Sequence, residues 1–128
     1  MKLNTHLDID NKLNGKVIEL NQNYAKVELI TIKTMIADQK GLIHGGFVFC
    51  AADYAAMCAV NDPFVVLAKS ETKFIAPVKV DDVVVFEAKV IDQNGIKSTV
   101  DIEAKVLEKV VFKGVFYTAT LDKHVLDI

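Results

Sequence analysis

The sequence predicts an α+β fold in which a curved antiparallel sheet of five to six strands wraps around one long central helix. Two observations carry this prediction. The chain reads as a hairpin, a single Ala-rich helix and then four β-type runs, in that order. One helix of about 16 residues cannot cover a flat sheet of that width, so the sheet must curl around it.

The first hairpin lies between Gly15 and Ile32. Two short runs of alternating character, 16–20 and 26–30, flank Asn21-Gln22-Asn23. Such a pattern is typical of strand, turn and strand. The following stretch, Thr34 to Ile43, is irregular and contains Gly41.

The central helix is expected from about Gly45 to Val60. The stretch is continuous and rich in Ala, and Asn61-Asp62-Pro63 ends it. Small side chains allow the helix backbone to approach the sheet closely, and they stand at Ala51, Ala52, Ala55, Ala56 and Ala59.

Four β-type runs follow the helix: Phe64 to Ile75, Val83 to Ile91, Ile96 to Leu107 and Val110 to Leu121. Alternation is cleanest in the third run, which predicts one buried and one solvated face. The expected buried side holds Ile96, Val100, Ile102, Ala104 and Val106. With neither repeat nor linker, residues 1–128 are expected to form a single domain.

Composition and charge exclude several classes of protein. Hydrophobic residues make up 52% of the chain, which is too many for a disordered protein, yet no stretch approaches the ~18 uncharged residues of a membrane span. The first residues lack the apolar core of a secretory signal, so we expect a cytoplasmic protein. The net charge is -2 and all 15 cations are Lys, which disfavours nucleic acid as a partner.

Cysteine and histidine positions give no reason to expect a metal site. Cys50 and Cys58 are about 12 Å apart along one helix, beyond the reach of a disulfide, and are expected to be buried free thiols. His6, His44 and His124 are scattered, and neither Cys has a ligand spacing. No metal and no separate cofactor are therefore expected.

The helix start and one acidic residue are the candidate catalytic groups of the sequence. The N–H groups of Gly45 and Gly46 are free donors at the positive end of the helix dipole, and they can hold a carbonyl oxygen as it becomes an oxyanion. Asp53 is the only charged residue between Lys40 and Asp62, and it shares a helix face with Phe49, Cys50, Met57 and Val60. A carboxylate with such neighbours is costly unless it is partnered or useful.

Gly45 and Asp53 cannot act on the same carbonyl within one chain. Eight helical residues separate them by about 12 Å. A catalytic role therefore predicts an antiparallel homodimer whose two composite sites each combine Gly45 of one subunit with Asp53 of the other. A dimer and a dimer of dimers both satisfy this requirement.

Two stretches carry a resemblance to a known family: Gly41-Leu42-Ile43-His44-Gly45-Gly46 with Asp53 nine residues after His44, and the segment 74–82. Through them the sequence, from about Gly15 to Leu121, resembles the hot-dog thioesterases, especially the small acyl-CoA thioesterases of the phenylacetate pathway. The resemblance implies a hot-dog domain that hydrolyses the thioester of an apolar acyl or aryl-acyl group, with coenzyme A as part of the substrate. By this resemblance Gly45 is the oxyanion donor, His44 shapes the site at the helix start, and Asp53 is the nucleophile or the general base.

Two positions depart from the family pattern. Asp38 stands where several members carry Asn, and Ala76 stands where an Arg often precedes the Pro. Phosphates of coenzyme A would then be met by lysines, for which Lys69, Lys73 and Lys79 are the candidates. Phe47, Phe49, Met57 and Phe74 are candidates for lining the acyl group.

Each of these residues also has a purely structural interpretation. The two glycines permit a tight entry into the helix, Asp53 can serve as an interface hydrogen-bonder, Phe and Met side chains fill cores, and lysines lie on surfaces. The alternative function is an acyl-CoA-binding protein that senses or sequesters its ligand without turnover. A dehydratase of the same fold ranks last, because His44 lies on the opposite side of the helix from Asp53.

Overall fold

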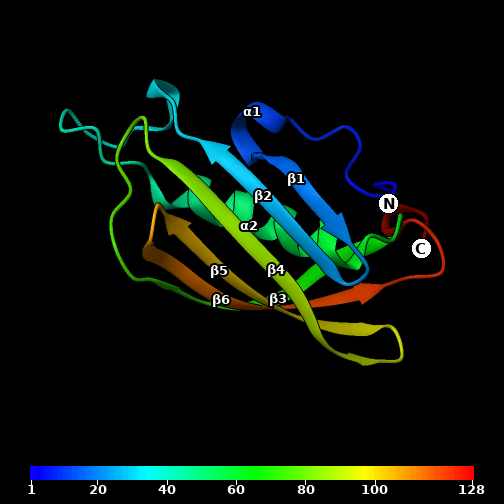
Figure 1. The fold of residues 1–128 in the computed structure, drawn as a ribbon. Helices are drawn as coiled ribbons and strands as arrows, with labels where there is room; N and C mark the ends of the chain where they lie inside the picture. The colour runs from blue at the N-terminus through cyan, green and yellow to red at the C-terminus, as the bar shows by residue number, and fades with distance from the viewer.

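A computed structural model describes residues 1–128 and has one six-stranded antiparallel sheet curled around a long helix (Figure 1). The helix α2 spans Gly45–Val60. The strands are β1 (Lys16–Asn21), β2 (Tyr24–Ile30), β3 (Val65–Phe74), β4 (Val83–Asn94), β5 (Lys97–Val106) and β6 (Lys109–Thr120). Their order across the sheet is β1-β2-β4-β5-β6-β3, so β1 and β3 are the edges. The predicted fold class is confirmed.

The strand boundaries differ from the predictions mainly at the turns. The first turn is shorter than predicted and contains only Gln22 and Asn23. The φ of Asn23, 59°, suits a tight hairpin turn. β4 extends to Asn94, beyond the predicted Ile91. The prediction that Ile96 is buried is wrong, because this residue lies in the β4–β5 turn and its side chain is exposed. Ser98 has the place on the buried side instead, and Val100, Ile102 and Ala104 follow it as predicted.

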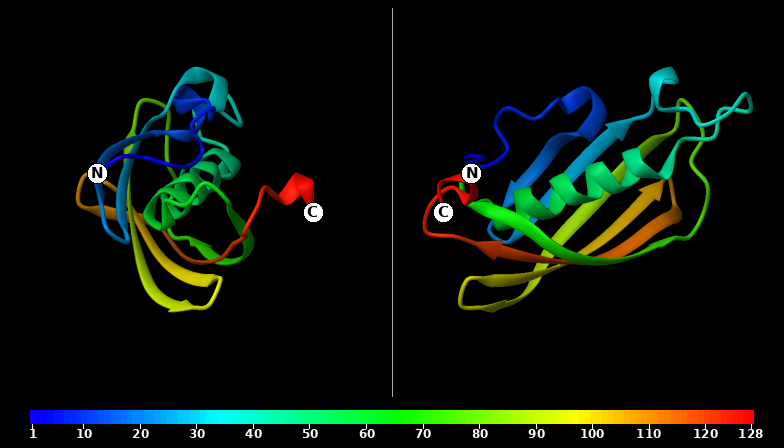
Figure 2. Two further views of the ribbon diagram at one scale, coloured as in Figure 1. Left: turned by 90° about the vertical axis from the view of Figure 1, so that its right-hand side faces the viewer. Right: turned by 180° about the vertical axis from the view of Figure 1, so that it is seen from behind.

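The core lies between α2 and the concave face of the sheet. Five alanines of the helix are buried, which confirms the close approach predicted for them. They pack against large side chains from the central strands, among them Phe86, Phe112 and Phe116. In the right-hand view of Figure 2 the helix lies in front of the sheet, with no strand covering the face turned to the viewer.

The N-terminal segment is tied to the C-terminal end of α2. Asn61 ends the helix in the left-handed conformation, with φ of 56° and its N–H on the Met57 carbonyl. Its side chain accepts a hydrogen bond from the Asn4 N–H at 2.7 Å and donates one to the Lys2 carbonyl at 2.8 Å. A short helix, α1 (Asn11–Asn14), and the 3₁₀ turns η1 (Lys33–Met35) and η2 (Val125–Asp127) were not predicted. No helix is both long and apolar enough to cross a membrane.

Candidate functional site

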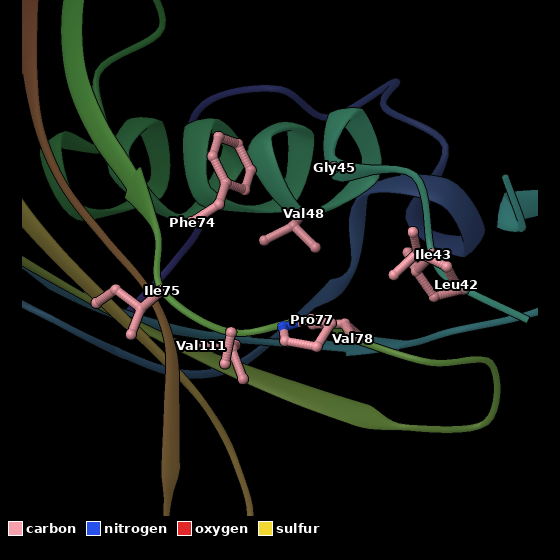
Figure 3. A pocket seen from close by; sticks show the side chains of 10 residues that line it. Leu42, Ile43, Gly45, Val48, Phe74, Ile75, Pro77, Val78 and Val111 are labelled. Carbon is pink, nitrogen blue, oxygen red and sulfur yellow. The ribbon is translucent and has the colours of Figure 1, made fainter.

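The N-terminal end of α2 opens on a small apolar cavity. Gly45 is the first residue of the helix, and the preceding His44 makes no side-chain cap. The first N–H groups of a helix have no partner within it, and neither glycine donates to a loop carbonyl. The cavity measures about 320 Å³ (Figure 3), and its walls are Leu42, Ile43, Gly45, Val48, Phe74, Ile75, Ala76, Pro77, Val78 and Val111. The helix start can therefore meet a ligand in a mostly apolar setting.

The two glycines are needed for different reasons. A Cβ on Gly45 would lie 3.3 Å from the ring of Phe74, and a Cβ on Gly46 would lie 2.9 Å from Nε2 of His44. The imidazole of His44 therefore occupies the space that Gly46 leaves open, and it lies nearly perpendicular to the ring of Phe47. Phe74 borders the other glycine from the edge strand β3.

Asp53 carries a buried oxygen that has no hydrogen-bond partner in the chain. Its Oδ1 is inaccessible to solvent and unpaired. Burial disfavours the charged form and raises the pKa of this carboxyl from 3.8 to about 6. Its neighbours on the less buried face of α2 are Phe49, Cys50 and Val60. An orphaned carboxylate on the open face of the helix is the least satisfied group of the protein.

A single chain does not bring Gly45 and Asp53 together. Both lie on α2, eight residues and about 12 Å apart along its axis. Asp53 is also absent from the walls of the cavity at Gly45.

A larger groove adjoins the cavity at the helix start. It measures about 810 Å³ and shares four wall residues with the cavity: Leu42, Pro77, Val78 and Val111. Asp38, predicted to contact substrate, lines this groove. Its Oδ1 accepts the N–H groups of Lys40 at 2.9 Å and Leu42 at 3.2 Å, so the carboxylate shapes the loop that forms one wall.

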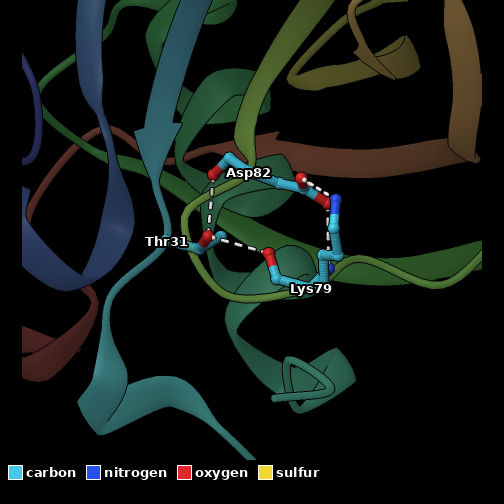
Figure 4. A network of polar contacts seen from close by, with 3 residues as sticks. All are labelled: Thr31, Lys79 and Asp82. Atoms are coloured by element: carbon cyan, nitrogen blue, oxygen red, sulfur yellow. Dashed lines mark hydrogen bonds and ion pairs between the residues drawn. The ribbon is translucent and has the colours of Figure 1, made fainter. Parts of the chain in front are cut away.

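The three predicted phosphate lysines lie in three different places. Lys79 is in the groove and pairs with Asp82 at 3.2 Å (Figure 4). Lys69 lies in another hollow of the sheet, pairs with Glu71 at 3.3 Å and sits over the ring of Tyr117. Lys73 is exposed on β3 and lines neither the cavity nor the groove.

The predicted acyl-lining residues do not form one pocket in a single chain, and Phe74 alone among them borders the cavity at Gly45. Met57 is fully buried in the core. Phe49 is half-buried and packs on Phe116, with ring centroids 5.5 Å apart. Phe47 is half-buried beside His44.

The two cysteines differ in a way the sequence did not indicate. Cys58 is buried, as predicted, and burial raises the pKa of its thiol to about 12. The prediction that Cys50 is buried is wrong, because its side chain is exposed next to Asp53. The open face of α2, to which the sheet gives no cover, accounts for this.

Two segments singled out by the resemblance, 41–46 and 74–82, supply many walls of the cavity and the groove. Sequence reasoning passed over the others. Val48 and Val111 gave no signal beyond helical or β periodicity, and Lys40, Glu108 and Lys109 stood between the predicted elements. The pairing of Leu42 with Lys79 across two loops brings these walls together.

Comparisons with known proteins agree with this architecture. The model of the thioesterase superfamily matches residues 40–113. An uncharacterised protein of Pyrococcus horikoshii has a crystal structure with a TM-score of 0.98 and 50% identity, covering 99% of this chain and 98% of that one. A hypothetical thioesterase of Streptococcus pneumoniae with coenzyme A shares the fold at 18% identity and a TM-score of 0.81, covering 93% of this chain and 95% of that one.

Two curated relatives are longer than this chain. Methylthioribose-1-phosphate isomerase of Aquifex aeolicus is 48% identical over 121 residues, which are 94% of this chain and 26% of that protein. Transcription factor FapR of Caldanaerobacter subterraneus is 28% identical over 113 residues, or 88% of this chain and 56% of that protein. The chain thus spans about a quarter and about half of these relatives. With its wrapped helix, its glycine-lined cavity and the family match over most of the sheet, the chain belongs to the thioesterase superfamily and has the hot-dog fold.

Proposed function

We propose that this protein is an acyl-CoA thioesterase that acts as a homodimer with two composite sites. Each site takes the Gly45 amide from one subunit and the Asp53 carboxylate from the other. The substrate is the thioester of an apolar acyl or aryl-acyl group, since the walls beside Gly45 are almost entirely apolar.

The observation that carries the proposal is the unpaired Oδ1 of Asp53. A buried carboxylate without a partner costs stability unless a second molecule completes its surroundings or it serves in a reaction. Its pKa of about 6 suits a group that is ionised at neutral pH and can still accept a proton. A second helix, antiparallel to the first, would supply the free glycine amides on the face where this oxygen lies.

The reaction follows from these two groups. The Gly45 N–H donates to the thioester carbonyl oxygen and stabilises the negative charge that develops there. Asp53 either removes a proton from the attacking water or attacks the carbonyl carbon itself. In the first route the C–S bond then breaks, Asp53 passes its proton to the departing thiolate, and the carboxylic acid remains. In the second route the thiolate leaves, takes a proton from water, and a mixed anhydride with Asp53 remains. Water hydrolyses this anhydride to the acid and restores the Asp53 carboxylate.

The experiment is a thiol-release assay on short, long and aryl acyl-CoAs with wild type and Asp53→Asn. Wild-type turnover that falls by a factor of about 10³ or more in the variant, with the same oligomer in solution, is the expected result. Asn has nearly the same size as Asp, so the variant should fold like wild type, and a loss of activity then reports the loss of the carboxylate. Full activity in the variant would refute the role of Asp53.

A second function has one specific observation in its favour. Transcription factor FapR matches 88% of this chain, so the same domain can serve a regulator. In that case the protein binds an acyl-CoA and leaves it intact. An acyl-CoA that raises the melting temperature and survives hours of incubation would favour this function over hydrolysis.

The isomerase relative does not lead to a third proposal. This chain covers 26% of that protein, and no isomerase activity is proposed for it.

A further inference from the structure

We infer that the groove beside the helix start binds the phosphate-bearing nucleotide end of coenzyme A, with Lys40 and Lys109 as its phosphate contacts. The inference rests on the proposed function, because it places the remainder of the substrate whose thioester lies at Gly45. Lys40 and Lys109 are proposed in place of Lys69 and Lys73, which lie outside this groove.

Continuity with the cavity is the first argument. The groove and the cavity at Gly45 share Leu42, Pro77, Val78 and Val111, so one extended molecule can occupy both. These shared walls are apolar and suit the uncharged arm that joins the thioester to the nucleotide. At about 810 Å³ the groove has room for a nucleotide, whereas the cavity of about 320 Å³ has not.

The groove is held in shape by hydrogen bonds between its walls. Val78 and Gly41 accept the N–H groups of Ile43 and Val80, each at 2.8 Å. Thr31 joins from the end of β2, where its hydroxyl donates to the Asp82 carbonyl at 2.7 Å and to the Lys79 carbonyl at 3.2 Å (Figure 4). A preformed site of this kind loses little conformational entropy on binding.

Two of the three lysines in the groove have free ammonium groups. Lys79 is committed, since its ammonium pairs with Asp82 at 3.2 Å and its N–H donates to the same carboxylate at 2.9 Å. Lys40 and Lys109 enter no ion pair in the chain. Lys40 lies in the loop before α2, and Lys109 is the first residue of β6.

The acidic residues of the groove also differ in whether the protein already occupies their charged groups. The carboxylates of Asp38 and Asp82 already accept hydrogen bonds from the protein. The carboxylate of Glu108 accepts no hydrogen bond from the protein and lies beside Lys109, so its negative charge repels a bound phosphate. Removing this charge should therefore strengthen binding.

The test compares one acyl group on coenzyme A with the same group on pantetheine, which has no phosphate. In Lys40→Glu/Lys109→Glu the KM for the coenzyme A thioester should rise about tenfold or more, while that for the pantetheine thioester stays within twofold. Glu108→Lys should lower the KM for the coenzyme A thioester. Lys69→Glu/Lys97→Glu, an equal charge change in the hollow at the β4–β5 hairpin, is the matched control.

Either of two results would overturn the inference. One is an equal KM change for both thioesters. The other is a KM for the coenzyme A thioester that rises as much in the control Lys69→Glu/Lys97→Glu as in Lys40→Glu/Lys109→Glu. If wild type hydrolyses no thioester, the proposed function fails. Titration of free coenzyme A into the same variants then still tests whether the groove binds its nucleotide end. Affinity for coenzyme A that is unchanged by both lysine substitutions would then refute it.

Discussion

Asp53 is the residue whose ionisation should control activity. Burial raises the pKa of its carboxyl to about 6, and the free carboxylate is needed both for proton removal and for direct attack. We therefore expect kcat/KM to rise about tenfold per pH unit below pH 6 and to level off above it. A pH profile of thiol release, with controls for stability at each pH, checks this. A profile that is flat from pH 5 to 8 would contradict it.

The same raised pKa makes the fold less stable as pH rises. The folded chain holds the Asp53 proton up to a pKa of about 6, whereas the unfolded chain loses it near 3.8. Stability from this group is complete below pH 3.8 and is lost between pH 3.8 and about 6, by at most ~3 kcal/mol. Asp53→Asn should remove this loss. Urea unfolding at pH 4.5 and 7.5, with wild type and variant at equal concentration, measures it; parallel pH dependences would show that the carboxylate is partnered.

Gly45 allows its amide to be removed without disturbing the helix. It is the first helical residue, where Pro is well tolerated, and His44 before it is extended with φ of -60° and ψ of 129°. Gly45→Pro removes the N–H, while Gly45→Ala keeps it and adds a comparable contact with Phe74. We expect Gly45→Pro to lower kcat by about 10²–10³ and Gly45→Ala to lower it much less. Similar losses in both variants would indicate that crowding by Phe74, and not the missing donor, is the cause.

At the scale of the elements, Asn61 has two structural roles at the end of α2. Its backbone has the left-handed conformation, and its side chain holds the N-terminal segment through Lys2 and Asn4. Asn61→Gly keeps the conformation and loses the side chain, whereas Asn61→Ala loses both. We expect Asn61→Ala to be less stable than Asn61→Gly by about 1 kcal/mol. Thermal unfolding measures that difference, and equal stabilities would mean that the backbone conformation costs nothing here.

The elements could be predicted from sequence because each one has its own period. The helix boundaries were predicted correctly, since the continuous Ala-rich run ends in Asn-Asp-Pro. The errors occur where burial depends on distant parts of the chain. Ile96 has the period of a buried residue but lies in a turn, and Cys50 is on a helix face that the sheet leaves open. The helix start and Asp53 were visible as motifs, whereas the groove arises from loops that meet only in the folded chain.

For the whole molecule, the open face of α2 and the edge strand β3 are the features that a second subunit would complete. β3 is ten residues long, its outer edge has no partner strand, and Phe74 and Ile75 at its end are exposed. A long unpaired edge next to exposed apolar residues favours pairing with another chain. The orphaned oxygen of Asp53 lies on the open face of α2, which the second subunit of the proposed dimer would have to cover.

Composite sites predict that two inactive variants rescue each other. A dimer of Gly45→Pro has no free amide, and a dimer of Asp53→Asn has no carboxylate. In a mixed dimer, one of the two sites combines the intact Gly45 of one subunit with the intact Asp53 of the other. After unfolding and refolding an equal mixture, half of the dimers are mixed, and about a quarter of wild-type activity should return. If each site lay within one chain, the mixture would have only the summed activity of the two variants, because every chain would still carry one defect.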